Sequence, residues 1–405
     1  MLNVHQAVNK LLGYFAPLSP ETIHFTDSLG RTLAEEIIAD QPYPPFDNSS
    51  MDGYAVVMED LQLASQDTPI SLTIIEDIPA GKEPEKLVKP GQASKIMTGA
   101  KIPEGANAVI RVEDTAQKQE IVEIFSPVKF GENIRRAGEN FAQDAPLLGP
   151  GHPIRPQEVA LFATLGKTSV KVTQKPKIGL LITGDELVAP KQTLRPGQIR
   201  DSNSYMLNAL MQNFAVDVVN NGIVEDSEEK IHRALNKMIE HQVDLIISTG
   251  GVSMGEYDYV RKAIEEKGTL EFWRVNIKPG KPIAFGYIEQ TPIIGLPGNP
   301  VSSYVGYHVF ILPVIRKLSG RENPSRLIIQ AALDSDLRSN ERESYIPATI
   351  KKDTNQYKVT PAQNQSSGNL YSLVQTNSLI ILPGGVEFFK ANDKVNVWIF
   401  DNNTI

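Results

Sequence analysis

Cysteine is absent from this sequence of 405 residues, and its absence removes several kinds of site. The chain can have no disulfide framework, no cysteine nucleophile and no thiolate metal ligand. Histidine is scarce as well: the six that occur form no HExxH pair or similar motif, which argues against a zinc site.

Long apolar runs are also missing. The nearest candidate, residues 304–315, is shorter than a membrane span and is interrupted by His308 and Pro313. The first residues, Met1 to His5, lack a basic region followed by an apolar run, so we expect no signal peptide. These observations predict a cytoplasmic protein without a membrane partner.

Positive charge is in short supply. Lysine and arginine number 40 against 48 aspartates and glutamates, which gives a formal net charge of −8. This balance argues against a general nucleic-acid binder. It also requires any site for an anionic ligand to be locally basic.

The residues that are present describe an ordinary globular chain with several parts. Hydrophobic residues make up 41% of it and charged residues 22%. Apolar residues at helical spacing predict a first helix over residues 3–16, and short runs between turns predict β structure over 55–140. Strands and helices alternate from residue 177, as in a parallel α/β domain, and residues 320–405 return to β structure, as a small barrel or sandwich.

Three loops of the α/β region follow apolar strands: residues 183–186, 249–253 and 297–302. Ligands of open parallel sheets bind outside the carboxyl ends of the strands, and the helix starts that follow offer N–H groups to anions. A glycine-rich turn alone is more often structural. Between the last two loops, however, Lys278 and Lys281 add the positive charge that the composition lacks.

Acidic residues gather at the same loops, and they suggest a divalent cation such as Mg²⁺ beside a phosphate. Two of them also have a structural explanation, because Asp226 heads a potential capping box and Asp258 can cap a helix starting at Tyr259. Asn299, followed by Pro300, can cap a further helix. The residues themselves therefore predict a magnesium-assisted enzyme acting on a phosphorylated or oxyanionic small molecule.

Seven motifs in one order carry a family resemblance. They are residues 47–55, 96–100, 133–136, 183–187, 248–253, 278–282 and 295–302. Together they resemble the molybdopterin molybdenumtransferases of the MoeA type, which are related to the C-terminal domain of gephyrin.

The resemblance implies a reaction and an assembly. Such enzymes bind adenylylated molybdopterin and molybdate as substrates, release AMP with the help of Mg²⁺, and leave molybdenum on the dithiolene. It implies an elongated homodimer whose cleft combines the α/β domain of one subunit with the β domain of the other. A molybdopterin adenylyltransferase is implied as the upstream donor, with molybdoenzyme apoproteins or their chaperones downstream.

The resemblance also implies a fold with four parts. It has a central three-layer α/β domain of the molybdopterin-binding fold with a parallel-type sheet, an inserted β-rich domain, a linker domain and a small C-terminal β-barrel. The implied boundaries are 1–50 with 141–175 for the linker and dimerisation domain, 51–140 for the inserted domain, 176–320 for the α/β domain and 321–405 for the barrel.

The resemblance also implies site residues, inside these motifs and beside them. The implied catalytic carboxylates are Asp52, Asp185, Glu186, Asp226 and Asp258. Of these, Glu186 and Asp258 are the implied metal ligands. The implied substrate-binding residues are Thr98, Arg135, Thr183, Gly184, Asp201, Ser202, Asn203, Thr249, Gly250, Gly251, Ser253, Lys278, Lys281, Pro297, Gly298, Asn299, Pro300 and Ser302.

One departure and three alternatives accompany the resemblance. Asn140 stands where the family usually has an aspartate, so the role of that carboxylate is in doubt here. A molybdopterin adenylyltransferase shares the α/β domain but is usually a single small domain. A gephyrin-like scaffold would use the fold without catalysis, and a relative that handles tungstate would show the same motifs.

Overall fold

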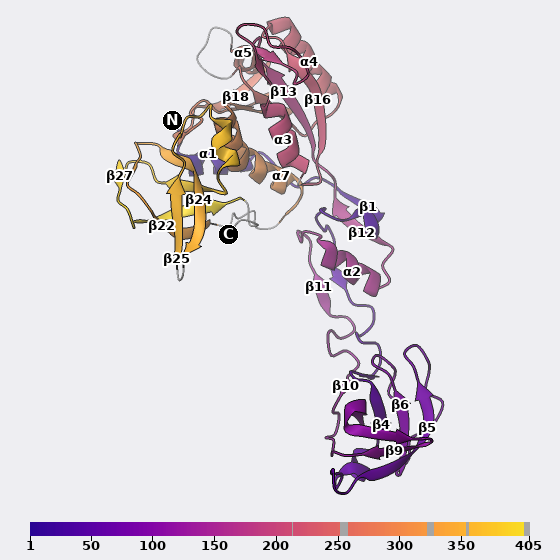
Figure 1. The fold of residues 1–405 in the computed structure, drawn as a ribbon. Coiled ribbons are helices and arrows are strands. Elements are labelled where there is room, and N and C mark those ends of the chain that lie inside the picture. The colour runs from indigo at the N-terminus through magenta and orange to yellow at the C-terminus, as the bar shows by residue number, and fades with distance from the viewer. Residues whose placement is uncertain (213, 252–257, 322–327, 354–355, 401–405) are drawn as a thin grey trace. The chain divides into compact units, whose positions relative to one another are not determined.

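The computed structural model describes residues 1–405 except 213, 252–257, 322–327, 354–355 and 401–405 (Figure 1). The chain folds into two compact units. Unit 1 comprises Met1–Glu35, Pro150–Ala163 and Lys167–Ile405, and unit 2 comprises Glu36–Gly149 and Thr164–Gly166. Among the helices of the described residues, none has the length and apolar character needed to cross a bilayer.

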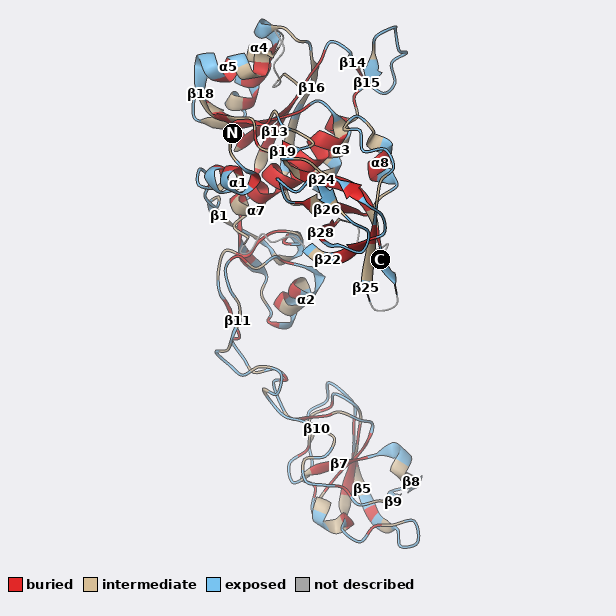
Figure 2. Cartoon of the chain, turned by 90° about the vertical axis from the view of Figure 1, so that its left-hand side faces the viewer, coloured by how far each residue is buried: buried red, intermediate tan, exposed pale blue. Residues whose placement is uncertain are grey.

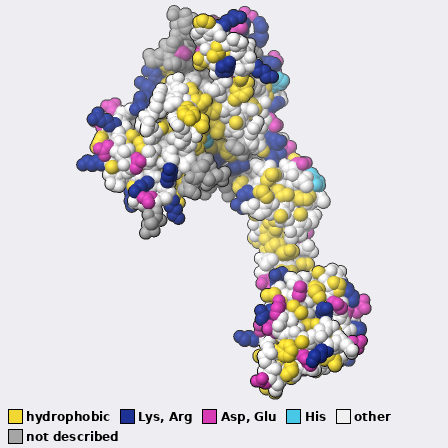
Figure 3. All heavy atoms as spheres, in the orientation of Figure 1, with side chains coloured by type: hydrophobic (Ala, Val, Ile, Leu, Met, Phe, Trp, Pro, Cys, Tyr) yellow, Lys and Arg dark blue, Asp and Glu magenta, His cyan; other side chains and the backbone are white. Residues whose placement is uncertain are grey.

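Unit 2 is built on one sheet with the strand order β7-β4-β6-β5-β9-β8. The strands are β4 (Gly53–Val56), β5 (Ile70–Ile78), β6 (Gln92–Ile96), β7 (Ala108–Arg111), β8 (Thr115–Lys118) and β9 (Ile121–Ile124). Only the β5–β6 pair is parallel among these ladders. Tyr54, Leu72 and Val122 are buried in its core, which agrees with the β structure expected for residues 55–140. On the face seen in Figure 3, basic and acidic side chains are interspersed over this unit.

Two short ribbons complete unit 2. They pair β3 (Asn48–Ser49) with β10 (Ile134–Arg135), and β2 (Ile37–Ile38) with β11 (Pro146–Leu148). Gly53 at the start of β4 faces the neighbouring strand so closely that a Cβ would lie 1.9 Å from the Ile110 carbonyl oxygen. A glycine is therefore required between the acidic loop that ends at Asp52 and the sheet.

The central sheet of unit 1 has the strand order β16-β13-β17-β21-β20-β18. Its strands are β13 (Lys177–Thr183), β16 (Asp217–Val224), β17 (Leu245–Thr249), β18 (Gly268–Trp273), β20 (Ala284–Ile288) and β21 (Thr291–Leu296). The first four in this order are parallel, as predicted, whereas β20 and β18 are antiparallel. Neither of these two strands was predicted from the sequence. A two-residue turn that holds Glu289 at φ 55° joins β20 to β21.

Helices cover both faces of this sheet, which makes three layers. The helices are α3 (Asn203–Gln212), α4 (Glu228–Glu240), α5 (Tyr259–Lys267), α6 (Pro300–Gly306) and α7 (Leu312–Leu318), with a π-helical turn, η4 (Tyr307–Ile311), between the last two. Leu180 on β13 faces the layer that contains α3 and α7, and Leu181 faces the layer of α4 and α5. Figure 2 shows α7 coloured as buried along most of its length.

The C-terminal part of unit 1 is a closed five-stranded barrel. Its strands follow the order β24-β25-β22-β28-β26, and pairing of β24 with β26 closes the ring. The strands are β22 (Ile328–Leu333), β24 (Glu343–Asp353), β25 (Gln356–Pro361), β26 (Ser378–Leu382) and β28 (Lys394–Ile399). The barrel, one of two folds left open by the strand pattern, is thus the one formed. A short strand of the α/β region, β19 (Ile277–Lys278), pairs with β24 and joins the two parts.

Unit 1 has further elements outside the central sheet and the barrel. They are α1 (Val4–Leu12), β1 (Pro20–His24), α2 (Pro156–Thr164), β12 (Ser169–Thr173), β14 (Leu187–Val188), β15 (Ile199–Arg200), β23 (Leu337–Arg338), β27 (Phe388–Phe389) and α8 (Leu370–Val374). The predicted first helix forms, and Val4, Ala7 and Leu11 bury its apolar face against the core of the α/β sheet. The four proposed domain boundaries stay a prediction.

Candidate functional site

A cavity of about 830 Å³ lies at the carboxyl ends of β13, β17 and β21 in unit 1. Strand β13 precedes both of its neighbours in the sequence, so the chain reverses its direction of winding there, which is where open α/β sheets bind ligands. The predicted site residues that line the cavity are Thr183, Glu186, Asp201, Ser202, Asn203, Thr249, Gly250, Gly251, Lys278, Pro297, Gly298, Asn299, Pro300 and Ser302. Most of the predicted α/β site thus meets at one place.

The Thr-Gly-Gly loop needs its glycines for packing. Gly250 has φ 87°, and a Cβ there would lie 2.8 Å from the Thr183 carbonyl oxygen. Gly251 has φ 65°, and a Cβ would lie 2.9 Å from Val260. Left-handed backbone and close approach both exclude larger residues, so these glycines bring the ends of β13 and β17 together. Ser253, predicted in the same loop, lies outside the described residues.

Glu186 projects beside the end of β13. Its carboxylate lies over Gly184, where a Cβ would come within 2.7 Å of Oε2. The neighbouring Asp185 is exposed, and its Oδ1 accepts a 2.9 Å hydrogen bond from the backbone N–H of Asp226. Three carboxylates therefore gather at this strand end, although only Glu186 among them lines the cavity within the described residues.

Asp226 does not cap α4, contrary to the capping-box prediction. The N-cap is Ser227, whose hydroxyl oxygen accepts from the backbone N–H of Lys230 at 3.4 Å. The first turn thus uses the shorter Ser227 side chain, which leaves the Asp226 carboxylate to point elsewhere. Its Oδ1 is buried, and no described residue forms a well-aligned hydrogen bond to that atom.

Burial raises the pKa of the Asp226 carboxyl above its usual range. The negative charges of Asp185 and Glu186 act in the same direction, and together these effects outweigh the nearby Thr183 hydroxyl, which lowers the pKa. A half-buried carboxyl beside two others, with one oxygen lacking a well-aligned donor, is a place where a cation would be stabilised.

Asp258 occupies the N-cap position of α5, as predicted, but its side chain makes no capping hydrogen bond. It is not among the described residues that line the cavity. Neither is Lys281, which is exposed and accepts backbone hydrogen bonds from Val275 and Ile283. Lys278, by contrast, is exposed at the cavity wall on β19.

The residues at the start of α3, Asp201 to Asn203, have a structural role in addition to lining the cavity. The buried Asp201 carboxylate accepts from the backbone N–H of Ser204 at 3.0 Å and also binds the Ser204 hydroxyl. Asn203 donates its amide to the Gly298 carbonyl oxygen at 2.7 Å, which links the start of α3 to the loop after β21. The Asn203 Oδ1 atom is buried, and the described residues supply no donor to it.

The loop after β21 differs from its prediction in one detail. Pro300 occupies the first turn of α6 and Asn299 the N-cap position, as expected, but the Asn299 side chain makes no capping bond. Its amide donates instead to the Ser367 hydroxyl at 3.0 Å, and Val301 N–H donates to the Ser367 carbonyl oxygen at 3.0 Å. The Asn299 side chain thus binds Ser367 of the C-terminal part and does not cap α6.

Sequence reasoning missed the residues that the barrel region adds to the cavity. They are Arg342, Tyr345, Ile346, Pro347, Gln365, Ser367, Gly368 and Leu370. Arg342 donates to the Ile277 carbonyl oxygen at 3.2 Å, next to Lys278, and Arg200 lines the cavity from β15. A lone arginine before a β-strand carries no sequence signal, so only the pairing of β19 with β24 reveals it.

Unit 2 brings two distant predicted residues together. Asp52 Oδ1 accepts from the Thr98 backbone N–H at 2.7 Å and from the Thr98 hydroxyl at 2.9 Å. The backbone N–H, and then the hydroxyl, holds the pKa of the Asp52 carboxyl below its usual range. Both residues are exposed, so the ionised carboxylate is presented to solvent in one orientation.

The arginine pair of unit 2 separates into two roles. Arg136 binds Asp47 at 2.6 Å, and the Ala137 N–H donates to the same carboxylate at 2.8 Å. Arg135 is exposed on β10. The exposed Asn140 donates its backbone N–H to the Tyr43 carbonyl oxygen at 3.0 Å. That bond does not depend on the side chain.

Family profiles match the chain from end to end. The "MoeA N-terminal region (domain I and II)" matches residues 2–166, the "probable molybdopterin binding domain" matches 179–317, and the "MoeA C-terminal region (domain IV)" matches 330–400.

Individual proteins agree with the profiles. A molybdopterin molybdenumtransferase of Staphylococcus epidermidis is 33% identical over 405 residues, which cover 100% of this chain and 96% of the relative. The Bacillus subtilis protein of the same name is 34% identical over 400 residues, 97% of this chain and 93% of the relative. The crystal structure of a molybdopterin biosynthesis moeA protein from Pyrococcus horikoshii superposes with a TM-score of 0.84 at 31% identity, covering 99% and 100% of the two chains.

Proposed function

This chain belongs to the MoeA family of molybdopterin molybdenumtransferases, and on that premise we propose that it inserts molybdate into adenylylated molybdopterin with release of AMP. Its curated relatives are named as transferases of molybdenum. The AMP release and the adenylylated form of the substrate are our proposal.

The observation that supports it most is the charge inside the cavity. A chain with a net charge of −8 places Lys278, Arg200 and Arg342 around one hollow of about 830 Å³. This volume lies within the range of small-molecule sites, about 300–1,000 Å³. Basic side chains next to strand-end N–H groups suit an oxyanion and a phosphate together.

We propose separate roles for the two ends of the cavity. Lys278 and Arg342 hold molybdate, a substrate, because molybdate is an anion and both side chains are cationic. The two residues line the cavity where β19 pairs with β24. The Thr249-Gly250-Gly251 loop holds the phosphate-bearing part of the pterin, because its glycines admit a ligand close to the backbone.

We propose Mg²⁺ as the cofactor, held by Glu186 and Asp258. Glu186 at the end of β13 and Asp258 at the start of α5 offer only oxygen donors, which fit a hard cation, and the buried Asp226 Oδ1 without a well-aligned donor adds a third candidate. When bound, Mg²⁺ would offset the negative charge of the phosphate. Glu186 would hold the cation beside the loop of Thr183 and Gly184.

The test is AMP release from adenylylated molybdopterin on addition of molybdate, with tungstate run in parallel. Release with molybdate that needs Mg²⁺ is the expected result. Release with tungstate alone would change the metal assignment. A folded protein that releases no AMP with either oxyanion would refute the transferase reaction and favour a scaffold.

Lys278→Ala tests the assignment of the oxyanion end. Loss of one charge-assisted hydrogen bond, about 1.5–3 kcal/mol, should weaken the apparent affinity for molybdate at least tenfold. The affinity for the pterin should change less. Lys352→Ala, an exposed lysine on β24, is the matched control and should leave both affinities unchanged. Equal losses for the two substrates would contradict the assignment.

We further propose a cytoplasmic homodimer that receives its substrate from an adenylyltransferase and delivers its product to molybdoenzyme apoproteins or their chaperones. Mixing inactive Asp52→Ala and Glu186→Gln proteins tests the dimer. If the two residues of one site come from different subunits, hybrid dimers regain one intact site and activity returns. Absence of any recovery after verified subunit exchange would contradict a shared site.

A further inference from the structure

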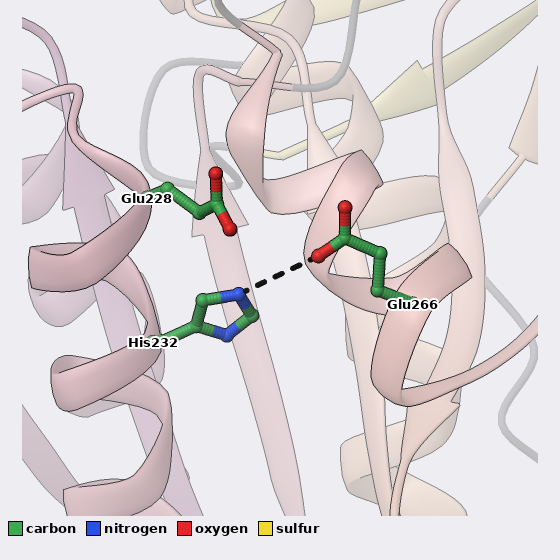
Figure 4. A group of neighbouring side chains, drawn as sticks. All are labelled: Glu228, His232 and Glu266. Atoms are coloured by element: carbon green, nitrogen blue, oxygen red, sulfur yellow. Dashed lines mark ion pairs between the residues drawn. The ribbon is translucent and has the colours of Figure 1, made fainter.

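A second group of metal-binding side chains lies between α4 and α5. Glu228 and His232 come from α4 and Glu266 comes from α5, and Figure 4 shows the three side chains pointing toward one another. Their candidate ligand atoms all lie within 4.8 Å of one another. Within the described residues, this is the one cluster of three or more such groups that meets this distance.

The two helices hold these groups in place. Glu228 and His232 are four residues apart, so they lie one above the other on the same face of α4. Ile231 and Leu235 of α4 pack with Ala263 and Ile264 of α5 in a common core. The pairing of the helices therefore fixes where the Glu266 side chain starts, opposite the α4 pair.

The histidine is the least exposed member of the group. Its side chain is 16% exposed, whereas that of Glu266 is 54% exposed, and the two are 3.8 Å apart between Nε2 and Oε2. Glu228 and His232 also line a surface hollow of about 610 Å³. The hollow beside Glu228 and His232 leaves room for a water molecule on a metal ion held by the imidazole and the two carboxylates.

Three described cations on α4 and α5 are engaged with glutamates outside the cluster. Arg233 pairs with Glu229 at 2.6 Å, and Arg261 pairs with Glu265 at 2.9 Å. Lys230 pairs with Glu225. The cations of these ion pairs thus neutralise glutamates outside the cluster, and two carboxylates remain close together beside one imidazole.

We propose that Glu228, His232 and Glu266 form a site for a divalent transition metal, with Zn²⁺ as the preferred ion. One imidazole and two carboxylates with an open fourth position are a donor set that zinc accepts. Zinc–ligand bonds of about 2.0–2.2 Å place tetrahedral donors about 3.4 Å apart. The present spacing of up to 4.8 Å exceeds this by up to about 1.4 Å, which rotation of the two exposed glutamates can close.

Glu266 lies far from Asp258, the carboxylate proposed above as an Mg²⁺ ligand on the same helix. Asp258 and Glu266 stand at opposite ends of α5, about 12 Å apart along its axis at 1.5 Å per residue. The HExxH spacing that the sequence lacks is therefore not required here, because the third ligand comes from a different helix. Bound metal would cross-link α4 to α5.

Equilibrium dialysis of the full-length, tag-free and chelator-treated protein against Zn²⁺ tests the proposal. Millimolar Mg²⁺ is kept in the buffer so that oxygen-only sites are occupied. We expect one zinc per chain in the wild type, and at least tenfold weaker binding in both His232→Ala and Glu266→Gln. His241→Ala and Glu240→Gln, which remove an exposed histidine and glutamate near the far end of α4, are the matched controls and should bind as wild type does.

Thermal unfolding supplies a second readout that needs no substrate. One equivalent of Zn²⁺ should raise the Tm of the wild type and of His241→Ala, and leave that of His232→Ala unchanged, because the metal binds only the folded helix pair. No zinc binding by the wild type, or binding by His232→Ala and Glu266→Gln as tight as that of the wild type, would overturn the site. If His232→Ala does not fold, the exposed Glu266→Gln variant decides.

Discussion

Asp52 in unit 2 and Asp226 in unit 1 are two aspartates of the proposed site with opposite environments. Two donors from Thr98 reach the Asp52 carboxylate, which is exposed, and its pKa falls. The Asp226 carboxyl is half-buried beside Asp185 and Glu186, one of its oxygens lacks a well-aligned donor, and its pKa rises. The ionised form of the aspartate side chain is therefore stabilised at Asp52 and destabilised at Asp226.

The difference shows what decides the charge state of a carboxyl in this protein. Neutral donors aimed at the oxygens stabilise the ionised form, while burial and neighbouring negative charge oppose it. Asp52 is thus kept ionised near neutral pH and is available there as a hydrogen-bond acceptor. Asp226 gains most from a cation, which would replace the missing donors.

Asp52→Ala is the strongest test of this comparison. Removal of a positioned carboxylate from the proposed site should lower the rate of molybdenum insertion about 100-fold or more, while the Tm stays within error because the side chain is exposed. Steady-state AMP release and thermal unfolding measure the two effects.

Two variants give the controls for that loss. Asp67→Ala, an exposed aspartate in another loop of unit 2, should keep full activity. Thr98→Val keeps the backbone donor to Asp52 but removes the hydroxyl, so it should lose activity only severalfold. Wild-type activity in Asp52→Ala would remove this residue from the site.

Glu158 shows which effect on the pKa is larger, because its carboxylate is buried and also accepts hydrogen bonds. It is 4% exposed, yet hydrogen bonds from the Arg155 side chain, opposed by burial and aided by His152, lower its pKa to about 2. The folded carboxyl titrates below the unfolded one, so its contribution is complete above about pH 4.3 and is lost as pH falls toward 2.

Glu158→Gln should therefore cost roughly 2 kcal/mol of unfolding free energy at pH 7. The cost should shrink between about pH 4.3 and 2, where the wild type becomes protonated. Urea unfolding at several pH values measures both. A constant difference across that range would show that burial, and not the donors, governs this carboxyl.

Asp226→Asn should give the smallest effect, and one of opposite sign. Because the folded pKa is raised, the folded state binds more protons, and the wild type loses stability as pH rises above the unfolded value of about 3.9. The amide cannot ionise, so the variant should be as stable as the wild type or slightly more so at pH 7. A marked loss of stability at pH 7 would show that the anion is already well solvated.

Local patterns were sufficient for much of the fold. Apolar runs with turn residues located β13 and β17, and apolar residues at helical spacing located α1 and α4, because burial of one face imposes a period that survives in the sequence. The antiparallel strands β18 and β20 were missed, since their short mixed runs lack such a period. The capping prediction at Asp226 was wrong by one residue because Ser227 fits the N-cap geometry as well.

The sequence by itself determined which chemical groups this protein carries and the order of its motifs, from Asp52 to Ser302. It could do so because a motif is a local property of the chain. Only the tertiary structure decided which groups face each other: Thr98 with Asp52, Arg342 with Lys278 at one cavity, and Glu266 with His232 between two helices. These contacts depend on the pairing of distant strands and helices, and no local pattern encodes the distance between residues that are far apart in the chain.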